Sequence, residues 1–105
     1  HFSDLRTGHA INSMISPGTI ISGAMVEKSV VGYNTRVHSF SHVNESVVMN
    51  NVVIGRGCKL YRVIIDKHVV IQPGTVIGQD PEEDANRFET TEDGIVVIPK
   101  GAEIG

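Results

Sequence analysis

Apolar side chains recur every five or six residues through most of this 105-residue chain, and no other feature restricts the possible folds as strongly. A spacing near six matches neither an α-helix nor an isolated strand. Residues two apart on an extended segment face the same way, and a more compact side chain stands two residues before each large one after the first. We therefore predict short sides, each sending one compact and one large side chain inward before the chain bends. The large set is Ala10, Ile15, Ile20, Val26, Val31, Val37, Val43, Val48, Ile54, Leu60, Ile65, Ile71 and Ile77; the compact set is Ser13, Gly18, Ala24, Ser29, Thr35, Ser41, Ser46, Val52, Cys58, Val63, Val69 and Thr75.

Longer blocks repeat as well. The segments AINSMI at 10–15, VEKSVV at 26–31, VNESVV at 43–48 and LYRVII at 60–65 follow one another at offsets of 16, 17 and 17 residues. Three sides per coil close a triangle, so the predicted fold class is all-β: a parallel β-helix of the hexapeptide-repeat type with about four coils. Hexapeptide solenoids are left-handed as a class, an exception to the usual right-handed crossover, although the sequence itself does not show handedness.

The length allows a single domain over 1–105. Within it we expect a lead-in at 1–9, coils over 10–80 and a C-terminal capping segment over 81–105. A solenoid needs its open ends covered, and the tail is the segment available for that role.

The tail carries signals for a helix and a strand. Asp80 stands where an N-cap would, and Pro81 suits the first helical position, so we predict a short helix that ends near Phe88. We expect Phe88 to cover the open coil end. The apolar run Gly94–Ile98 predicts a strand.

Composition excludes several classes of function. The formal net charge is −3 and there is no basic block, so we expect no nucleic-acid partner. No apolar run approaches the length of a membrane span, so we expect no membrane partner and a cytoplasmic location. The single Cys58 belongs to the compact inward set, which predicts a buried thiol that acts as a small apolar group, not a nucleophile.

Outward positions form columns of their own. We expect four apolar residues to stack on one outer face: Met14, Val30, Val47 and Ile64. We also expect another domain or subunit to cover them. The alternative is a solvated strand face. On the same face we expect a charge ladder of Lys28, Glu45 and Arg62 that fixes register, and at one corner a stack of Asn34, Asn51 and His68.

The sequence contains no recognisable catalytic motif and no metal-spaced cluster. His38 and His42, placed on one short side, would be roughly 13 Å apart, too far to share a metal ion. Arg56, Lys59 and Lys67 are expected on adjacent coils, where two or three cations could hold a small anionic metabolite. The alternative is that they are solvated surface charges.

Several segments resemble the C-terminal domain of bacterial glucose-1-phosphate adenylyltransferase. The resemblance covers nearly the whole chain, and the most specific part is the tail, with Asp84, Arg87-Phe88 and Gly94–Ile98. The other matching segments are Arg6–Gly8, Asn12–Ile15, Ile21–Ala24, Ser39–Val43, Glu45–Met49, Val53–Cys58 and Val63–Lys67.

The resemblance implies a parent enzyme that joins ATP and glucose 1-phosphate into ADP-glucose and pyrophosphate with Mg²⁺, for glycogen or starch synthesis, as a homotetramer under allosteric control. In that family the chemistry lies in an N-terminal nucleotidyltransferase domain, whose motifs have no counterpart here. This chain should then be inert alone, need no cofactor of its own and pack on that catalytic domain. The match of Ile65–Lys67 to an activator-binding segment of plant and cyanobacterial relatives implies an effector role for Lys67. Glu92 and Asp93 stand where those relatives have a second effector lysine.

Two other readings remain open. A trimeric hexapeptide acyltransferase would use a histidine at the subunit seam, His38 or His42, with an acyl-coenzyme A donor. The lack of a loop insertion between Val26 and Ile77 counts against it. The third reading is a purely structural solenoid.

Overall fold

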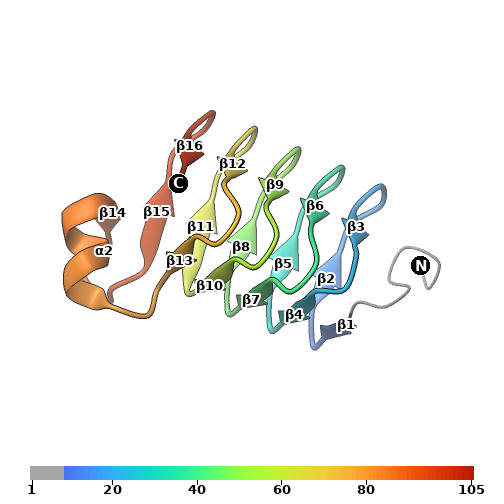
Figure 1. The fold of residues 1–105 in the computed structure, drawn as a ribbon, viewed down its shortest axis with the longest axis horizontal. Coiled ribbons are helices and arrows are strands. Elements are labelled where there is room, and N and C mark those ends of the chain that lie inside the picture. The colour runs from blue at the N-terminus through green and yellow to red at the C-terminus, as the bar shows by residue number, and fades with distance from the viewer. Residues whose placement is uncertain (1–8) are drawn as a thin grey trace.

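The computed structural model describes residues 9–105 and shows short strands wound into a three-sided prism (Figure 1). Each coil contributes one strand to each of three parallel sheets. The first sheet contains β1 (His9–Ile11), β4 (Met25–Glu27), β7 (His42–Asn44), β10 (Lys59–Tyr61) and β13 (Val76–Ile77). The second contains β2 (Met14–Ile15), β5 (Val30–Val31), β8 (Val47–Val48), β11 (Val63–Ile65) and β15 (Val96–Ile98), with β14 (Glu89–Thr90) added antiparallel at its end. The third contains β3 (Ile20–Ile21), β6 (Arg36–Val37), β9 (Val53–Ile54), β12 (Val70–Ile71) and β16 (Glu103–Ile104).

The structure is the predicted left-handed parallel β-helix, and the strand register confirms its repeat. His9 pairs with Met25 at an offset of 16 residues, and His42 pairs with Lys59 at an offset of 17. Val37, Ile54 and Ile71 align on successive strands of the third sheet, as the triangular interior requires. The core is one continuous cluster of these inward residues, which include Val26, Val43, Val48, Leu60 and Ile65.

One inward position was predicted one residue too early. Ile21 is fully buried, whereas Ile20 is 39% exposed, and Thr19 replaces Gly18 as the compact inward residue. The first coil is one residue shorter than the next. The missing residue falls at the corner between Ile21 and Val26, whereas the prediction placed it between Ile15 and Ile20. Because Ile20 and Ile21 are both apolar, the periodicity alone could not separate them.

Three edges of the prism are formed by residues with a left-handed backbone. The first edge holds Asn12, Lys28, Glu45 and Arg62; the second holds Gly18, Asn34, Asn51, His68 and Gly101; the third holds Gly23, Phe40, Gly57 and Gly74. The predicted corner stack of Asn34, Asn51 and His68 is therefore confirmed. Lys28, Glu45 and Arg62 were wrongly placed on a flat strand face, because the bend comes at these residues and turns them away from the sheet.

Hydroxyl groups of the compact inward set link successive coils. The Ser46 hydroxyl accepts from the Val63 N–H and donates to the Asn44 carbonyl at 2.8 Å. The Ser29 hydroxyl accepts in the same way from the Ser46 N–H at 3.0 Å. Since a buried N–H without a partner is costly, small hydroxyl residues fit these positions better than alanine would.

The C-terminal segment begins with the predicted helix. Helix α2 (Pro81–Arg87) has Asp80 as its N-cap, whose side chain accepts from the Glu82 and Glu83 N–H groups. Phe88 follows the helix and packs against the core cluster, as expected for a residue that covers the coil end.

The solenoid resumes after the helix, which the sequence pattern did not predict. β15 pairs with β11 and β16 pairs with β12, so the expected capping segment also supplies two sides of a fifth coil. Figure 1 shows α2 and β14 beside this last coil. At the other end, β1 begins at His9, a residue assigned to the lead-in; the rest of the lead-in, including Arg6–Gly8, lies outside the described residues.

Candidate functional site

The second sheet presents the predicted apolar column to its outer face. Met14 pairs with Val30, Val30 with Val47, and Val47 with Ile64, so the four side chains are in register on neighbouring strands. Met14 is 72% exposed and Val47 is 40% exposed, while Ile64 is half-buried. Val97 of β15 continues the column as a fifth member, which sequence reasoning missed because the repeat is interrupted before it.

The three candidate cations do not form one cluster. Arg56 lies at the third edge beside Gly57, and Lys59 follows on β10 of the first sheet. Lys67 lies at the second edge, beside His68, and its backbone N–H donates to Asp66 Oδ1 at 2.7 Å. Lys59 and Lys67 belong to one coil and Arg56 ends the coil before it, and the prism separates Lys67 from Arg56 and Lys59 by a full side.

A shallow hollow of about 350 Å³ lies on the first sheet near the third edge. Its lining includes Gly23, Ala24, Met25, Phe40 and Lys59. The remaining lining residues are His9, Ser41 and His42. The Arg56 guanidinium carbon lies 4.8 Å from the centre of the Phe40 ring, a cation–π distance.

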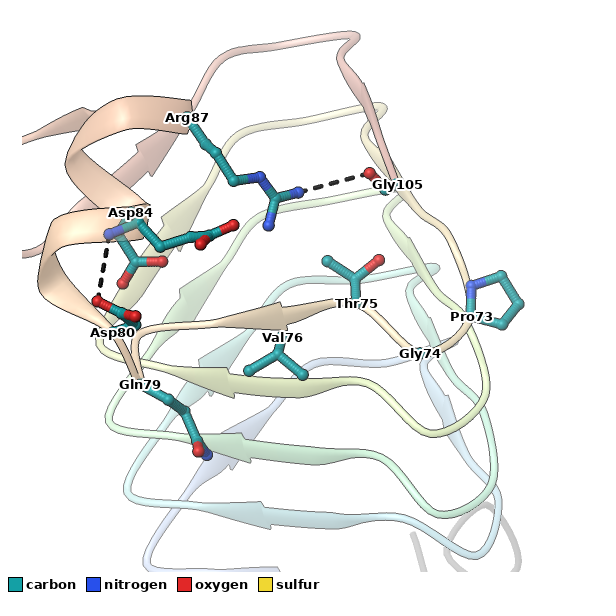
Figure 2. A pocket seen from close by; sticks show the side chains of 10 residues that line it. Pro73, Gly74, Thr75, Val76, Gln79, Asp80, Asp84, Arg87 and Gly105 are labelled. Carbon is teal, nitrogen blue, oxygen red and sulfur yellow. Dashed lines mark hydrogen bonds between the residues drawn. The ribbon is translucent and has the colours of Figure 1, made fainter.

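A second hollow, of about 510 Å³, lies between α2, β13 and the last residue described, Gly105 (Figure 2). Arg87 reaches across it and donates to the Gly105 carbonyl at 3.4 Å. Asp84 is buried beside it, and its Oδ2 accepts from the Gly78 N–H at 2.9 Å. This carboxylate therefore has a structural partner and fastens the helix to the end of the first sheet.

The single cysteine occupies the compact inward position predicted for it. Cys58 is fully buried, and its Sγ donates to the Gln72 carbonyl at 3.1 Å. Burial raises the pKa of the Cys58 thiol, because the thiolate would lose its solvation. A thiol kept protonated and out of solvent is poorly suited to be a nucleophile.

The two histidines considered for catalysis or metal binding do not share one side. His38 follows β6 of the third sheet, and His42 lies on β7 of the first sheet, with the Phe40 corner between them. Within residues 9–105, no group of three or more His, Cys, Asp or Glu side chains is arranged to hold a metal ion. In the same range no helix has the length and apolar character needed to cross a membrane.

These features define a class: a hexapeptide-repeat β-helix domain with an apolar outer face and a buried interior. A sequence model of the family described as "GlmU-like, C-terminal hexapeptide" matches residues 1–98. The chain belongs to this family of GlmU-like C-terminal hexapeptide domains.

Curated relatives give a more specific likeness. The chain is 50% identical over 94 residues to glucose-1-phosphate adenylyltransferase of Photobacterium profundum, covering 90% of this chain and 23% of that protein. It is 51% identical over 102 residues to the enzyme of that name from Deinococcus radiodurans, covering 96% of this chain and 25% of that protein. The Rhodopseudomonas palustris enzyme is 47% identical over 100 residues, which are 95% of this chain and 24% of that protein. The chain thus spans about a quarter of the length of these relatives, and the predicted resemblance is confirmed.

Proposed function

We propose that this chain is the non-catalytic β-helix domain of a glucose-1-phosphate adenylyltransferase. The observation that carries the proposal is identity near 50% over at least nine-tenths of the chain to enzymes with that name. The activity would be transfer of the adenylyl group of ATP to glucose 1-phosphate, giving ADP-glucose and pyrophosphate. The setting would be glycogen synthesis in the cytoplasm, within a homotetramer under allosteric control.

The chemistry would lie in a separate catalytic domain. The interior of the solenoid is filled by apolar side chains and by hydroxyl groups whose hydrogen bonds stay inside the coils, which leaves no internal chamber for ATP and glucose 1-phosphate. The residues described here do not fit a magnesium site, so Mg²⁺ would be held by that other domain.

The apolar column would be the surface that packs on the catalytic domain. Its members lie in register along one sheet and form a continuous apolar strip on its outer face. Relatives about four times as long supply the additional polypeptide that could cover it.

Lys67 would contribute to an effector site at the second edge. Its side chain is exposed at a corner, free of the sheets, and its backbone is fixed by the Gly101 N–H bond to its carbonyl at 3.0 Å. A phosphorylated metabolite is an anion that such a cation can bind. Because Arg56 and Lys59 lie elsewhere, the remaining cations of this site would come from the catalytic domain.

A domain exchange tests the proposed function. This chain replaces the matching quarter of the Deinococcus radiodurans enzyme, and ADP-glucose formation is measured for the chimera, for this chain alone and for the truncated relative. We expect activity from the chimera, none from this chain alone and little from the truncated enzyme. Turnover by this chain alone would overturn the assignment of roles, and a folded but inactive chimera would overturn the family-specific proposal.

A further inference from the structure

The outer face of the third sheet carries a column of side chains that contains one charge of each sign. In strand order from β3 to β16, the members of this third-sheet column are Ile20, Arg36, Val53, Val70 and Glu103. Val70 is 38% exposed and Val53 is half-buried, while Arg36 and Glu103 are both exposed. The column therefore has an apolar centre with a cation on one side and an anion on the other.

The column is complementary to itself when its order is reversed. Arg36 lies one strand before Val53, and Glu103 lies one strand after Val70. A two-fold axis parallel to the strands, between β9 and β12, would place a second copy face to face with its strand order reversed. Arg36 then faces Glu103 of the second copy, and Val53 faces its Val70. The symmetry repeats both contacts, and Ile20 lies outside the overlap.

The neighbouring outward column is compatible with the same pairing. Gly55 and Gln72 follow the register pair Ile54 and Ile71, so each would face the other type in the second copy. A glycine opposite a glutamine leaves room for the longer side chain. The Gln72 Nε2 also donates to Glu103 Oε2 within one molecule, which holds the carboxylate on this face. An arginine from the second copy would bond to it through Oε1, as a charge-assisted hydrogen bond.

The charges select this arrangement and this sheet. A parallel arrangement, with the strand orders of the two copies aligned, would bring Arg36 against Arg36 and Glu103 against Glu103, and like charges across an interface are unfavourable. The apolar column of the second sheet has no charge that could fix a register. On the first sheet, the outward column that contains Lys59 has no acidic member.

We propose that the third sheet is the contact surface of an antiparallel dimer of this domain. The overlap of four strands about 4.8 Å apart, on a molecule 22 Å wide, limits the flat contact area to about 400 Å² per copy. Stable complexes bury about 800 Å² per partner, so the isolated domain should dimerise weakly. The contact would strengthen within a larger assembly that holds two copies together. The proposal rests on this domain alone and does not need the proposed transferase role.

A charge exchange tests the proposed register. Sedimentation equilibrium of this chain between about 10 µM and about 1 mM gives the dimer dissociation constant for each protein. Arg36→Glu and Glu103→Arg each place like charges opposite one another at both ends of the contact, whereas the double variant restores opposite charges. Val70→Asp places a carboxylate near the symmetry axis. Val47→Asp is the matched control, since Val47 is 40% exposed but lies on the second sheet.

We expect each single charge reversal and Val70→Asp to weaken the dimer at least fivefold. The double reversal should return the dissociation constant to within twofold of the unaltered chain, which a misfolded variant would not do. Val47→Asp should change it less than twofold. Three results would overturn the proposal: a monomer at all concentrations, no recovery in the double reversal, or equal losses in Val47→Asp and Val70→Asp. These measurements follow self-association and not turnover, so their failure leaves the domain-exchange result unaffected.

Discussion

The Ser46 hydroxyl accepts a hydrogen bond from the Val63 N–H at 3.2 Å, although the two residues belong to different coils. Both residues are buried, and the same hydroxyl also donates to the Asn44 carbonyl. One side chain thus satisfies backbone groups of two coils. Contacts of this kind explain how a narrow prism with short strands remains ordered without a thick hydrophobic layer.

Ser46→Ala should destabilise the chain by about 1–3 kcal/mol, because the buried Val63 N–H would lose its acceptor. The free energy of unfolding from urea titration measures this loss. Ser22→Ala is the matched control, since Ser22 is exposed, and it should change stability by less than about 0.5 kcal/mol. Equal effects of the two substitutions would contradict the linking role of Ser46.

Val47→Asp should weaken packing on the catalytic domain in the proposed full-length enzyme more than it weakens folding of this chain. Val47 is 40% exposed, so a carboxylate there stays hydrated in the free domain but would be desolvated under a covering surface. Val70→Asp is the control, because Val70 is 38% exposed on the third sheet. Association of the two domains expressed separately can be followed by size-exclusion chromatography. Equal binding by both variants would remove the apolar column from the interface.

Lys67→Ala in the proposed full-length enzyme should shift the activator concentration for half-maximal stimulation upward several-fold, with basal rate changed less than twofold. The lysine would contact the effector and not the reacting groups, so only the regulated part of the rate should respond. Lys28→Ala, at the first edge, serves as a control for loss of one positive charge from the surface. An activation curve identical to that of the unaltered enzyme would exclude Lys67 from the effector site.

Cys58→Ser should remove part of the loss of stability at alkaline pH. The pKa of Cys58 is raised in the folded chain by burial, so above the ordinary thiol pKa, about 8.5, the unfolded chain releases a proton that the folded chain retains. The contribution of this thiol is therefore fully present below that pH and declines above it, by at most about 1.4 kcal/mol per pH unit. Urea titrations at pH 7 and pH 10 measure the difference, since other titrating groups are common to both proteins. Parallel pH dependence in the two would contradict a shifted thiol.

Most of the fold could be predicted because the interior repeats at the level of single residues. The coils, the Asp80 cap and the corner at His68 all follow from local patterns, each with its own backbone requirement. Ile20 was misassigned because two adjacent isoleucines satisfy the same pattern. The last coil was missed because α2 interrupts the period between β13 and β15, and only the three-dimensional register restores it.

The candidate sites were harder to predict from the sequence than the fold was. The apolar column was predicted because outward residues repeat as regularly as inward ones. The grouping of Arg56 with Lys67 was wrong in space, since residues near in sequence can lie on different edges of a triangular coil. The hollow beside Phe40 had no linear signal, because its lining comes from four successive coils.

The carboxylate of Asp84 has a consequence for assembly. Inside the first sheet a backbone N–H bonds to the carbonyl of the following coil, as the Lys59 N–H does to Thr75 at 2.9 Å, whereas the Gly78 N–H meets Asp84. Exposed sheet edges invite other chains to add strands. Asp84 already bonds to this edge of the first sheet, and helix α2 lies beside it. A second molecule therefore cannot add its strands here end to end, which prevents this repetitive fold from growing into a filament.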